Sequence, residues 1–149
     1  MALYCLSTFS DVIIDAGSKI SVRKIDLEKL QSDFDNKQWC HFNALENTHD
    51  QVSIDIHIQS DLSWFVGHFP QQPVLPGVVQ THWACELSQY FFSVSEFEKV
   101  INLKFISMIV PEVKLVLNLD FNSEKKAVAF SYKNATETFS SGSLRFKQG

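Results

Sequence analysis

Apolar and polar residues alternate along several stretches of the chain, and this alternation predicts strands. In residues 51–58 every second residue is Val or Ile, and the residues between them are polar or charged. An alternation of period two is typical of a strand with one buried face and one solvated face. Comparable stretches, several of them separated by short polar turns, predict further strands at 39–46, 99–109, 112–121, 127–133 and 139–146.

One long segment follows a helical pattern instead. Residues 78–92 contain no proline or glycine, and apolar residues recur at i, i+4 spacing, namely Val79, Trp83, Leu87 and Phe91. Other apolar residues widen this surface, so we expect the helix to be buried on more than one face. A shorter helix is predicted directly after Asp26, which is a suitable N-cap, with Leu27, Leu30 and Phe34 on one side.

The order of these elements predicts an α+β fold. Short turns between successive strands favour an antiparallel sheet. One long apolar helix against such a sheet requires the sheet to curl around the helix. Residues 37–149 are predicted to form this domain. Residues 1–36 are predicted to be an N-terminal appendage, with two weak strand candidates at 11–14 and 20–25, and both an ordered and a partly disordered state are left open.

Composition narrows the class of protein. A chain of 149 residues with 45% apolar and 20% charged residues is typical of one soluble globular domain. The net charge of −4 argues against a nucleic-acid-binding protein, which needs a basic surface. No stretch reaches the roughly 20 apolar residues of a membrane span. The start of the chain lacks the features of a signal peptide, so we expect a cytoplasmic protein.

The three cysteines, Cys5, Cys40 and Cys85, show no spacing of the C-x-x-C type. An odd number without such a spacing favours reduced thiols over a disulfide framework or a zinc site. No metal site and no nucleotide-binding motif are predicted.

The most distinctive stretch lies before the long helix. It contains GHFP at 67–70 and PVLPGV at 73–78, so that three prolines separate His68 from the start of the helix. Each proline restricts its own φ and disfavours helical geometry in the residue before it. Pro76 and Gly77 stand where the helix begins, a position that tolerates proline well. The pattern predicts a stiff loop that holds a histidine near a helix N-terminus.

This stretch resembles the active-site motif of the hot-dog-fold β-hydroxyacyl-(acyl-carrier-protein) dehydratases, which reads roughly G-H-F-P-x-x-P-x-x-P-G-V. The match extends over about a dozen positions with the same spacing, and the flanking strand order agrees. Within that family, PVLPGVVQ-x-x-WA at 73–84 looks most like the branch that serves aryl polyene synthesis. Residues 1–36 lie outside the resemblance.

The resemblance implies dehydration of a 3-hydroxyacyl thioester, carried on a phosphopantetheine arm, to the trans-2-enoyl product. His68 then suits the base that removes the α-proton, because imidazole titrates near neutral pH. The backbone N–H of Gly77, at a helix N-terminus, suits the thioester oxygen. Phe65, Phe69 and Val78 are candidate substrate contacts, and ordinary core packing remains the alternative for the aromatic side chains.

The chain departs from the family at the second catalytic position, where the family places Glu or Asp fourteen residues after the histidine and this chain has His82. Three interpretations stay open. His82 is the proton donor, assisted by Glu86 one turn further on. Alternatively, Glu86 has taken over the carboxylate role. In the third, the chain is inactive alone and is an acyl-carrier-binding or partner-supporting subunit.

The resemblance also implies the partners. We expect an acyl carrier protein, whose acidic surface would favour a basic docking patch. We expect at least a homodimer, or a heteromer with another hot-dog subunit that supplies the missing carboxylate. No cofactor is needed beyond the pantetheine arm of the substrate. A hot-dog thioesterase is the rival enzyme.

Overall fold

The computed structural model describes residues 10–11, 23–24, 26–66 and 72–148 of the chain. Its helices are α1 (Leu27–Asp33), the short 3-10 helix η2 (Ser63–Phe65) and α2 (Gly77–Phe91). Its strands are β1 (Ser10–Asp11), β2 (Arg23–Lys24), β3 (His41–Asn47), β4 (Gln51–His57), β5 (Phe97–Phe105), β6 (Lys114–Asn122), β7 (Ala127–Lys133) and β8 (Thr138–Phe146). Among these described residues, no helix is long and apolar enough to cross a membrane.

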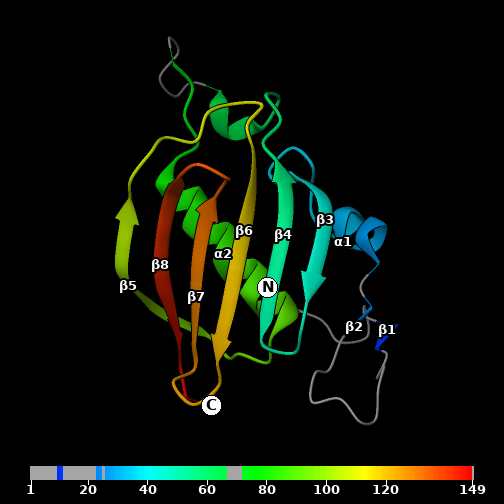
Figure 1. The fold of residues 1–149 in the computed structure, drawn as a ribbon, viewed down its shortest axis with the longest axis vertical. Helices are drawn as coiled ribbons and strands as arrows, with labels where there is room; N and C mark the ends of the chain where they lie inside the picture. Colours follow the sequence, from blue (N-terminus) through cyan, green and yellow to red (C-terminus); the bar gives the residue numbers. More distant parts are fainter. Residues whose placement is uncertain (1–9, 12–22, 25, 67–71, 149) are drawn as a thin grey trace.

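Six strands form one antiparallel sheet in the order β3-β4-β6-β7-β8-β5, and β1 and β2 pair separately (Figure 1). Five of the strand predictions are confirmed to within three residues at each end. The β3–β4, β6–β7 and β7–β8 pairs are neighbours in sequence, as their short turns predict. The connection from β5 to β6 is different, because β5 pairs with β8 at the sheet edge.

The predicted end of the strand at 99–109 is wrong, since β5 ends at Phe105. The backbone N–H groups of Ile106 and Ser107 both donate to the carbonyl of Phe139, at 2.8 and 3.1 Å. Two successive donors on one carbonyl break the alternation that a ladder requires. Beyond this point the chain leaves the edge of β8 and crosses over to β6. The alternation of apolar residues continues to Val110, so the sequence pattern does not indicate where the chain changes direction.

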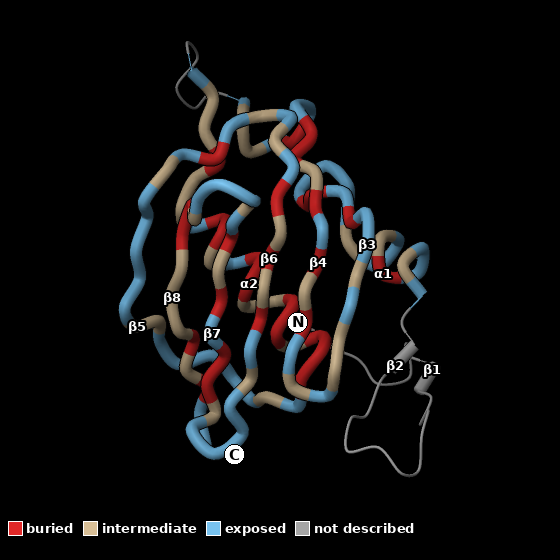
Figure 2. Tube along the Cα trace, in the orientation of Figure 1, coloured by how far each residue is buried: buried red, intermediate tan, exposed pale blue. Residues whose placement is uncertain are grey.

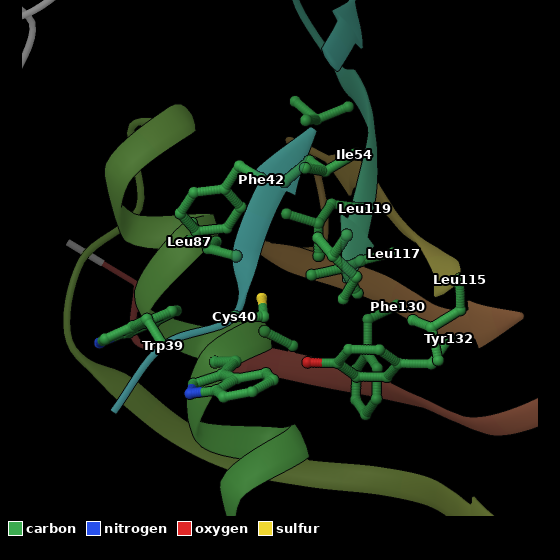
Figure 3. Packing of buried hydrophobic residues seen from close by; sticks show 14 of the residues in the cluster. Trp39, Cys40, Phe42, Ile54, Leu87, Leu115, Leu117, Leu119, Phe130 and Tyr132 are labelled. Atoms are coloured by element: carbon green, nitrogen blue, oxygen red, sulfur yellow. The ribbon is translucent and has the colours of Figure 1, made fainter. Parts of the chain in front are cut away.

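Helix α2 lies against one face of the sheet and supplies much of the core (Figures 1 and 2). Trp83, Ala84 and Leu87 are fully buried and belong to one apolar cluster with the strand residues Leu117 and Tyr132. Figure 3 shows part of this cluster, with Leu87 on the helix and Leu117 and Tyr132 on the sheet. The alternation read from the sequence holds on β4 and β6, where every second residue is buried. The α+β class and the curved antiparallel sheet are therefore confirmed, and the wrapping of the sheet around α2 stays a prediction.

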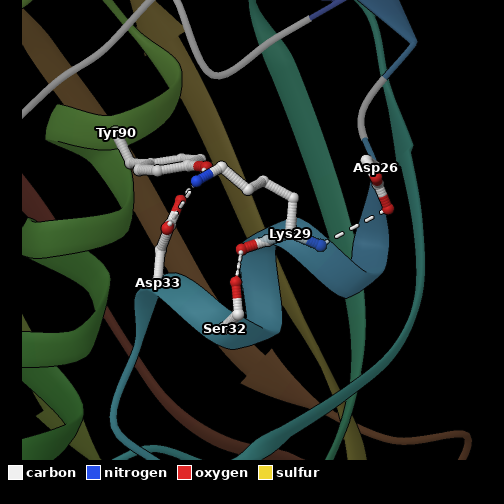
Figure 4. A network of polar contacts seen from close by, with 5 residues as sticks. All are labelled: Asp26, Lys29, Ser32, Asp33 and Tyr90. Atoms are coloured by element: carbon white, nitrogen blue, oxygen red, sulfur yellow. Dashed lines mark hydrogen bonds and ion pairs between the residues drawn. The ribbon is translucent and has the colours of Figure 1, made fainter.

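The short helix α1 begins as predicted, with the Asp26 carboxylate accepting the backbone N–H of Glu28 at 3.0 Å. Its Leu30 side chain is 0% exposed and belongs to the main core. At its C-terminal end, the Tyr90 hydroxyl of α2 donates to the Asp33 carboxylate at 3.0 Å (Figure 4). Helix α1 is thus joined to α2 by both apolar and polar contacts. The division of the chain at residue 36 stays a prediction.

The two edge strands of the sheet, β3 and β5, differ in whether another part of the chain binds their outer backbone groups. On β3, the Gln31 side chain of α1 accepts the Phe42 backbone N–H at 2.7 Å and donates to the Cys40 carbonyl at 3.3 Å. The Gln31 amide thus forms the two kinds of hydrogen bond that a neighbouring strand would form, and it protects part of this edge from pairing with another chain. Strand β5 forms the opposite edge, and most of its residues are exposed. Among the described residues, β5 has a strand partner on one side alone.

We predict that Leu30→Ala destabilises the whole domain. Removing a fully buried Leu costs about 2–5 kcal/mol of unfolding free energy, because apolar contacts are lost and a cavity remains. Urea unfolding followed by tryptophan fluorescence measures this value. Lys29→Ala is the matched control, since its ion pair with Asp33 is exposed and contributes little. Equal unfolding free energies for the two variants would show that α1 is not part of the core.

Candidate functional site at the start of helix α2

Two predicted site residues, His68 and Phe69, lie outside the residues that the structure describes. The other half of the predicted site is described, because it consists of the last part of the proline-rich loop and the first turns of α2. Pro76 is the N-cap residue, with φ −60° and ψ 145°, and Gly77 is the first residue of the helix. The prediction that Pro76 and Gly77 stand at the helix start is confirmed.

Among the described residues, nothing accepts the backbone N–H groups of Gly77 and Val78, whereas the N–H of Val79 donates to the Pro76 carbonyl at 3.1 Å. An α-helix leaves its first N–H groups without partners inside the helix. Here no side chain caps them, because the N-cap residue is proline. The positive end of the helix dipole adds to their attraction for a partially negative oxygen. These properties suit an oxyanion donor, and the catalytic role assigned to Gly77 stays a prediction.

Gly77 also has a steric reason to be glycine. A Cβ atom added there would lie 2.6 Å from Cζ of Phe105 and 2.8 Å from its Cε1. The ring of Phe105, at the end of β5, thus lies directly against the start of α2. Phe105 is not among the site residues predicted from the sequence. No local pattern relates it to Gly77, because the two residues meet only after β5 has joined the sheet.

A pocket of about 280 Å³ opens beside this contact. Its lining is mostly apolar and comes from the loop, the helix start and the segment after β5, including Val74, Leu75, Gly77, Phe105, Ile106 and Met108. Phe105, Ile106 and Met108 are 51%, 61% and 57% exposed, which is unusual for large apolar side chains. Such a surface is suited to an apolar ligand or to another protein chain.

Val78 and His82 lie on the face of α2 that the sheet does not cover. They are four residues apart, so they occupy the same side of the helix. Val78 is 76% exposed, and His82 is exposed as well. The imidazole of His82 contacts the indole of Trp39, with ring centroids 5.9 Å apart. The expectation of burial on more than one side is thus met only in part, because one face of α2 is open in the single chain.

Glu86 is the carboxylate nearest to His82 along the helix, and it is half-buried. Among the described residues, no hydrogen bond or ion pair within 4.0 Å joins the two side chains. In the single chain, Glu86 therefore does not hold a proton on His82 through a direct contact. The assignment of the acid to His82 or to Glu86 stays a prediction.

The aromatic candidates before the loop pack partly into the protein. Trp64 and Phe65 lie in η2, and both side chains are partly buried against the core. The indole N–H of Trp64 donates to the Gln38 carbonyl at 2.8 Å, as does that of Trp83 at 2.9 Å. Because both indoles bind the same carbonyl, the segment before the loop is connected to α2 through Gln38. The substrate contacts assigned to Phe65 and Val78 stay predictions.

The remaining candidate groups have structural explanations. Burial, together with the neighbouring charge of Glu86, raises the pKa of Cys85 to about 12, so the thiol is protonated at neutral pH. A protonated thiol is a poor nucleophile. His57 donates its Nε2–H to the Glu112 carboxylate at 2.9 Å, on the polar face of β4 where the sequence places it. Among the described residues, no cluster of His, Cys, Asp or Glu side chains could hold a metal ion.

The fold and the site define a hot-dog-like α+β protein whose candidate site lies where a proline-rich loop meets a helix N-terminus. The family model of the ApeI-like proteins, described as ApeI dehydratase, matches residues 44–143. That is more than half of the chain, so this protein belongs to the ApeI-like dehydratase family. The resemblance to the aryl polyene branch of hot-dog dehydratases is confirmed. No curated protein matches the chain.

Two solved structures are similar in fold. One is a chain of the dehydratase heterocomplex ApeI:P from Xenorhabdus doucetiae, at 27% identity and a TM-score of 0.70, with 74% of this chain and 99% of that chain covered. The other is an uncharacterized protein from Erwinia carotovora subsp. atroseptica, at 32% identity and a TM-score of 0.60, with 70% of this chain and 90% of that chain covered.

We predict that the effect of Gly77→Ala depends on Phe105. In the wild-type background the new methyl group meets the Phe105 ring, and displacing it costs about 1–3 kcal/mol. In a Phe105→Ala background the space is open. The substitution then becomes neutral or stabilising by up to about 1 kcal/mol, because Ala favours helix more than Gly does.

Urea unfolding of the two single variants and the double variant measures this dependence. We expect a coupling free energy of about 0.5–3 kcal/mol, typical of residues in contact. If Gly77→Ala changes the stability equally in both backgrounds, Phe105 does not explain the glycine.

Proposed function

We propose that this chain catalyses the dehydration of a 3-hydroxyacyl thioester, carried on acyl carrier protein, to the trans-2-enoyl product. Membership of a dehydratase family supports the reaction class. The observation that carries the proposal is the start of α2 at Gly77, where the first backbone N–H groups have no partner among the described residues and lie beside a mostly apolar pocket. An acyl thioester needs a donor for its carbonyl oxygen and an apolar surface for its chain, and both are adjacent there.

In the proposed reaction, His68 removes the α-proton of the bound thioester. The electron pair of that C–H bond moves toward the carbonyl, and the Gly77 N–H stabilises the negative charge on the oxygen. His82, in its imidazolium form, gives its proton to the β-hydroxyl. The C–O bond then breaks, water leaves, and the electron pair forms the double bond. His68 ends protonated and His82 neutral, so a proton must pass between them before the next turnover.

Phe69, Phe65 and Val78 are the proposed contacts for the substrate. No cofactor is proposed, because the phosphopantetheine arm belongs to the substrate. We propose that the reaction takes place in the cytoplasm and serves aryl polyene synthesis or a related acyl-chain pathway.

One observation favours a second candidate function. Position 82 carries an imidazole where related dehydratases use a carboxylate, and no direct contact to Glu86 supports it in the single chain. A chain with such a site suits an acyl-carrier-binding subunit or a subunit that supports a catalytic partner. The similar structure from Xenorhabdus doucetiae is a heterocomplex, which agrees with this alternative.

We also propose that β5 and the apolar surface beside it contact a second hot-dog subunit, identical or different. The edge of β5 is exposed, whereas the edge of β3 is partly occupied by Gln31. Val78 and His82 face the same open side of α2, and Gly77, next to Val78 in the helix, lies against Phe105. A subunit placed there would cover this apolar surface and bring a further carboxylate within reach of His82.

We predict that His68→Ala and His82→Ala each lower kcat for the formation of enoyl thioester by about 10²–10⁴, the usual contribution of one acid or base. The assay incubates 3-hydroxyacyl and enoyl thioesters of acyl carrier protein with each variant and follows both directions by mass spectrometry. His49→Ala is the matched control, since the His49 side chain is 62% exposed and has no proposed role.

The possible results separate the candidates. Activity that survives in His82→Ala but not in His68→Ala would show that His82 is not the acid. Absence of turnover in both directions with the wild-type chain would favour the binding or supporting subunit. Release of free thiol would identify a thioesterase.

We predict that the purified chain sediments as a dimer or larger assembly, and that Ile106→Lys weakens this assembly. Ile106 is 61% exposed, and a lysine there would place an unpaired charge in an apolar interface, a loss of about 2–5 kcal/mol of association free energy. Sedimentation equilibrium over a concentration series measures the change. Ser123→Lys, in the β6–β7 turn, is the control. If both variants associate like the wild type, the surface beside β5 is not the interface.

A further inference from the structure

Gln80 is a buried polar residue in the first turns of α2, and each of its polar atoms has a hydrogen-bond partner. It is 3% exposed. Its side-chain Nε2 donates to the Leu75 carbonyl at 3.1 Å, and its Oε1 accepts the Ser140 hydroxyl at 2.7 Å. Its backbone carbonyl accepts the Tyr132 hydroxyl at 2.7 Å. Because a carbonyl can only accept, the contact with Leu75 determines which end of the amide faces the loop.

These bonds join elements that are far apart in sequence. Ser140 is 0% exposed on β8, and Tyr132 is 0% exposed on β7. Burial raises the pKa of the Tyr132 hydroxyl well above its usual value, so it stays protonated and remains a donor. Both strands lie inside the six-stranded sheet, with a strand partner on either side. Gln80 thus connects the loop before α2 to two interior strands of the sheet.

A leucine at this position would fill the core without such a network. Burying an amide costs free energy unless all its hydrogen bonds form, and a complete network holds its partners in one arrangement. The presence of Gln80 therefore points to a need for a particular geometry of the loop. The residue that it holds, Leu75, is two positions before Gly77 and is itself 1% exposed.

Gln80 holds both peptide units that precede Gly77. Its side chain binds the carbonyl of the Leu75–Pro76 unit, and its backbone N–H donates to the Pro76 carbonyl at 3.2 Å, a carbonyl that also accepts the Val79 N–H at 3.1 Å. The Leu75 N–H donates to the Ile109 carbonyl at 2.8 Å, which holds the loop from its other side. All described peptide bonds are trans, so the Gly77 N–H points opposite to the Pro76 carbonyl. It therefore points out of the helix end, beside the pocket that Gln80 also lines.

We propose that Gln80 is a positioning residue that sets the direction of the Gly77 N–H and so aligns this donor with the carbonyl oxygen of the bound thioester. Its effect on turnover rests on the proposed function, because Gly77 is an oxyanion donor only if a thioester binds there. Its effect on the direction of the N–H bond does not depend on turnover. The two parts can therefore be tested separately.

The direct test is the one-bond ¹⁵N–¹H residual dipolar coupling of Gly77, which reports the direction of that bond. It is measured in the assembly in which the chain purifies, for the wild type and for Gln80→Leu. We expect the Gly77 coupling to change while the couplings of β6 and β7 stay at their wild-type values. Gln80→Met serves the same purpose if Gln80→Leu does not fold, since it also removes the donor to Leu75.

Ser140→Ala and Tyr132→Phe are the matched controls. Each removes one buried hydrogen bond to Gln80, and each leaves the bond between Gln80 and the Leu75 carbonyl in place. Each control leaves one buried hydrogen-bonding group without its partner, as the Gln80 variants do. We therefore expect the controls and the Gln80 variants to lose similar amounts of unfolding free energy. We expect the Gly77 coupling to keep its wild-type value in both. An unchanged coupling in the Gln80 variants, or an equal change in the controls, would overturn the proposal.

Kinetics then test the functional part. We expect Gln80→Leu to lower kcat about 10- to 100-fold with little change in KM. The reason is that a hydrogen bond from the Gly77 N–H stabilises the negative oxygen of the transition state more than the neutral carbonyl of the bound substrate. Ser140→Ala and Tyr132→Phe should keep kcat near the wild-type value. A changed Gly77 coupling without a change in kcat would overturn the catalytic part of the role. A wild-type chain that converts no thioester refutes the proposed function, and the coupling still decides whether Gln80 directs the N–H.

Discussion

The contact between α2 and the sheet is the interaction on which the rest of this structure depends. Trp83, Ala84 and Leu87 are buried completely, and each large apolar side chain of this kind contributes about 1.5–3 kcal/mol by leaving water. This burial places the start of α2 at one end of the sheet, where the proline-rich loop and the end of β5 also meet it. The candidate site is therefore a consequence of helix packing, although its own residues contribute little to the core.

The same packing leaves one side of α2 open. Val78 and His82 are exposed there, and the large apolar side chains beside β5 are exposed nearby. A protein that exposes apolar surface next to an unpaired strand edge is at risk of uncontrolled association. The opposite edge, β3, is partly blocked by the Gln31 amide. The structure thus limits edge pairing largely to β5, which agrees with the assembly of a related family member as a heterocomplex.

The histidine at position 82 is the chemical question that family membership leaves open. A carboxylic acid and an imidazolium both donate a proton, and each loses one unit of positive charge when it does so. The carboxyl group becomes an anion, whereas the imidazolium becomes neutral. Burial, which disfavours the charged form, therefore opposes proton release from a carboxyl group and favours it from an imidazolium. In the single chain, His82 contacts the indole of Trp39 and no described carboxylate.

The sequence alone determined the secondary elements, because apolar periodicity is a local property that survives in β4, β6 and α2 as buried faces. It also determined the helix start at Gly77, since proline and glycine restrict the backbone wherever they occur. Tertiary structure alone decided that β5 pairs with β8, that Phe105 lies against Gly77, and that Gln80 accepts the Ser140 hydroxyl. These contacts join residues that no local pattern relates, so they exist only once the sheet and the helix have packed together.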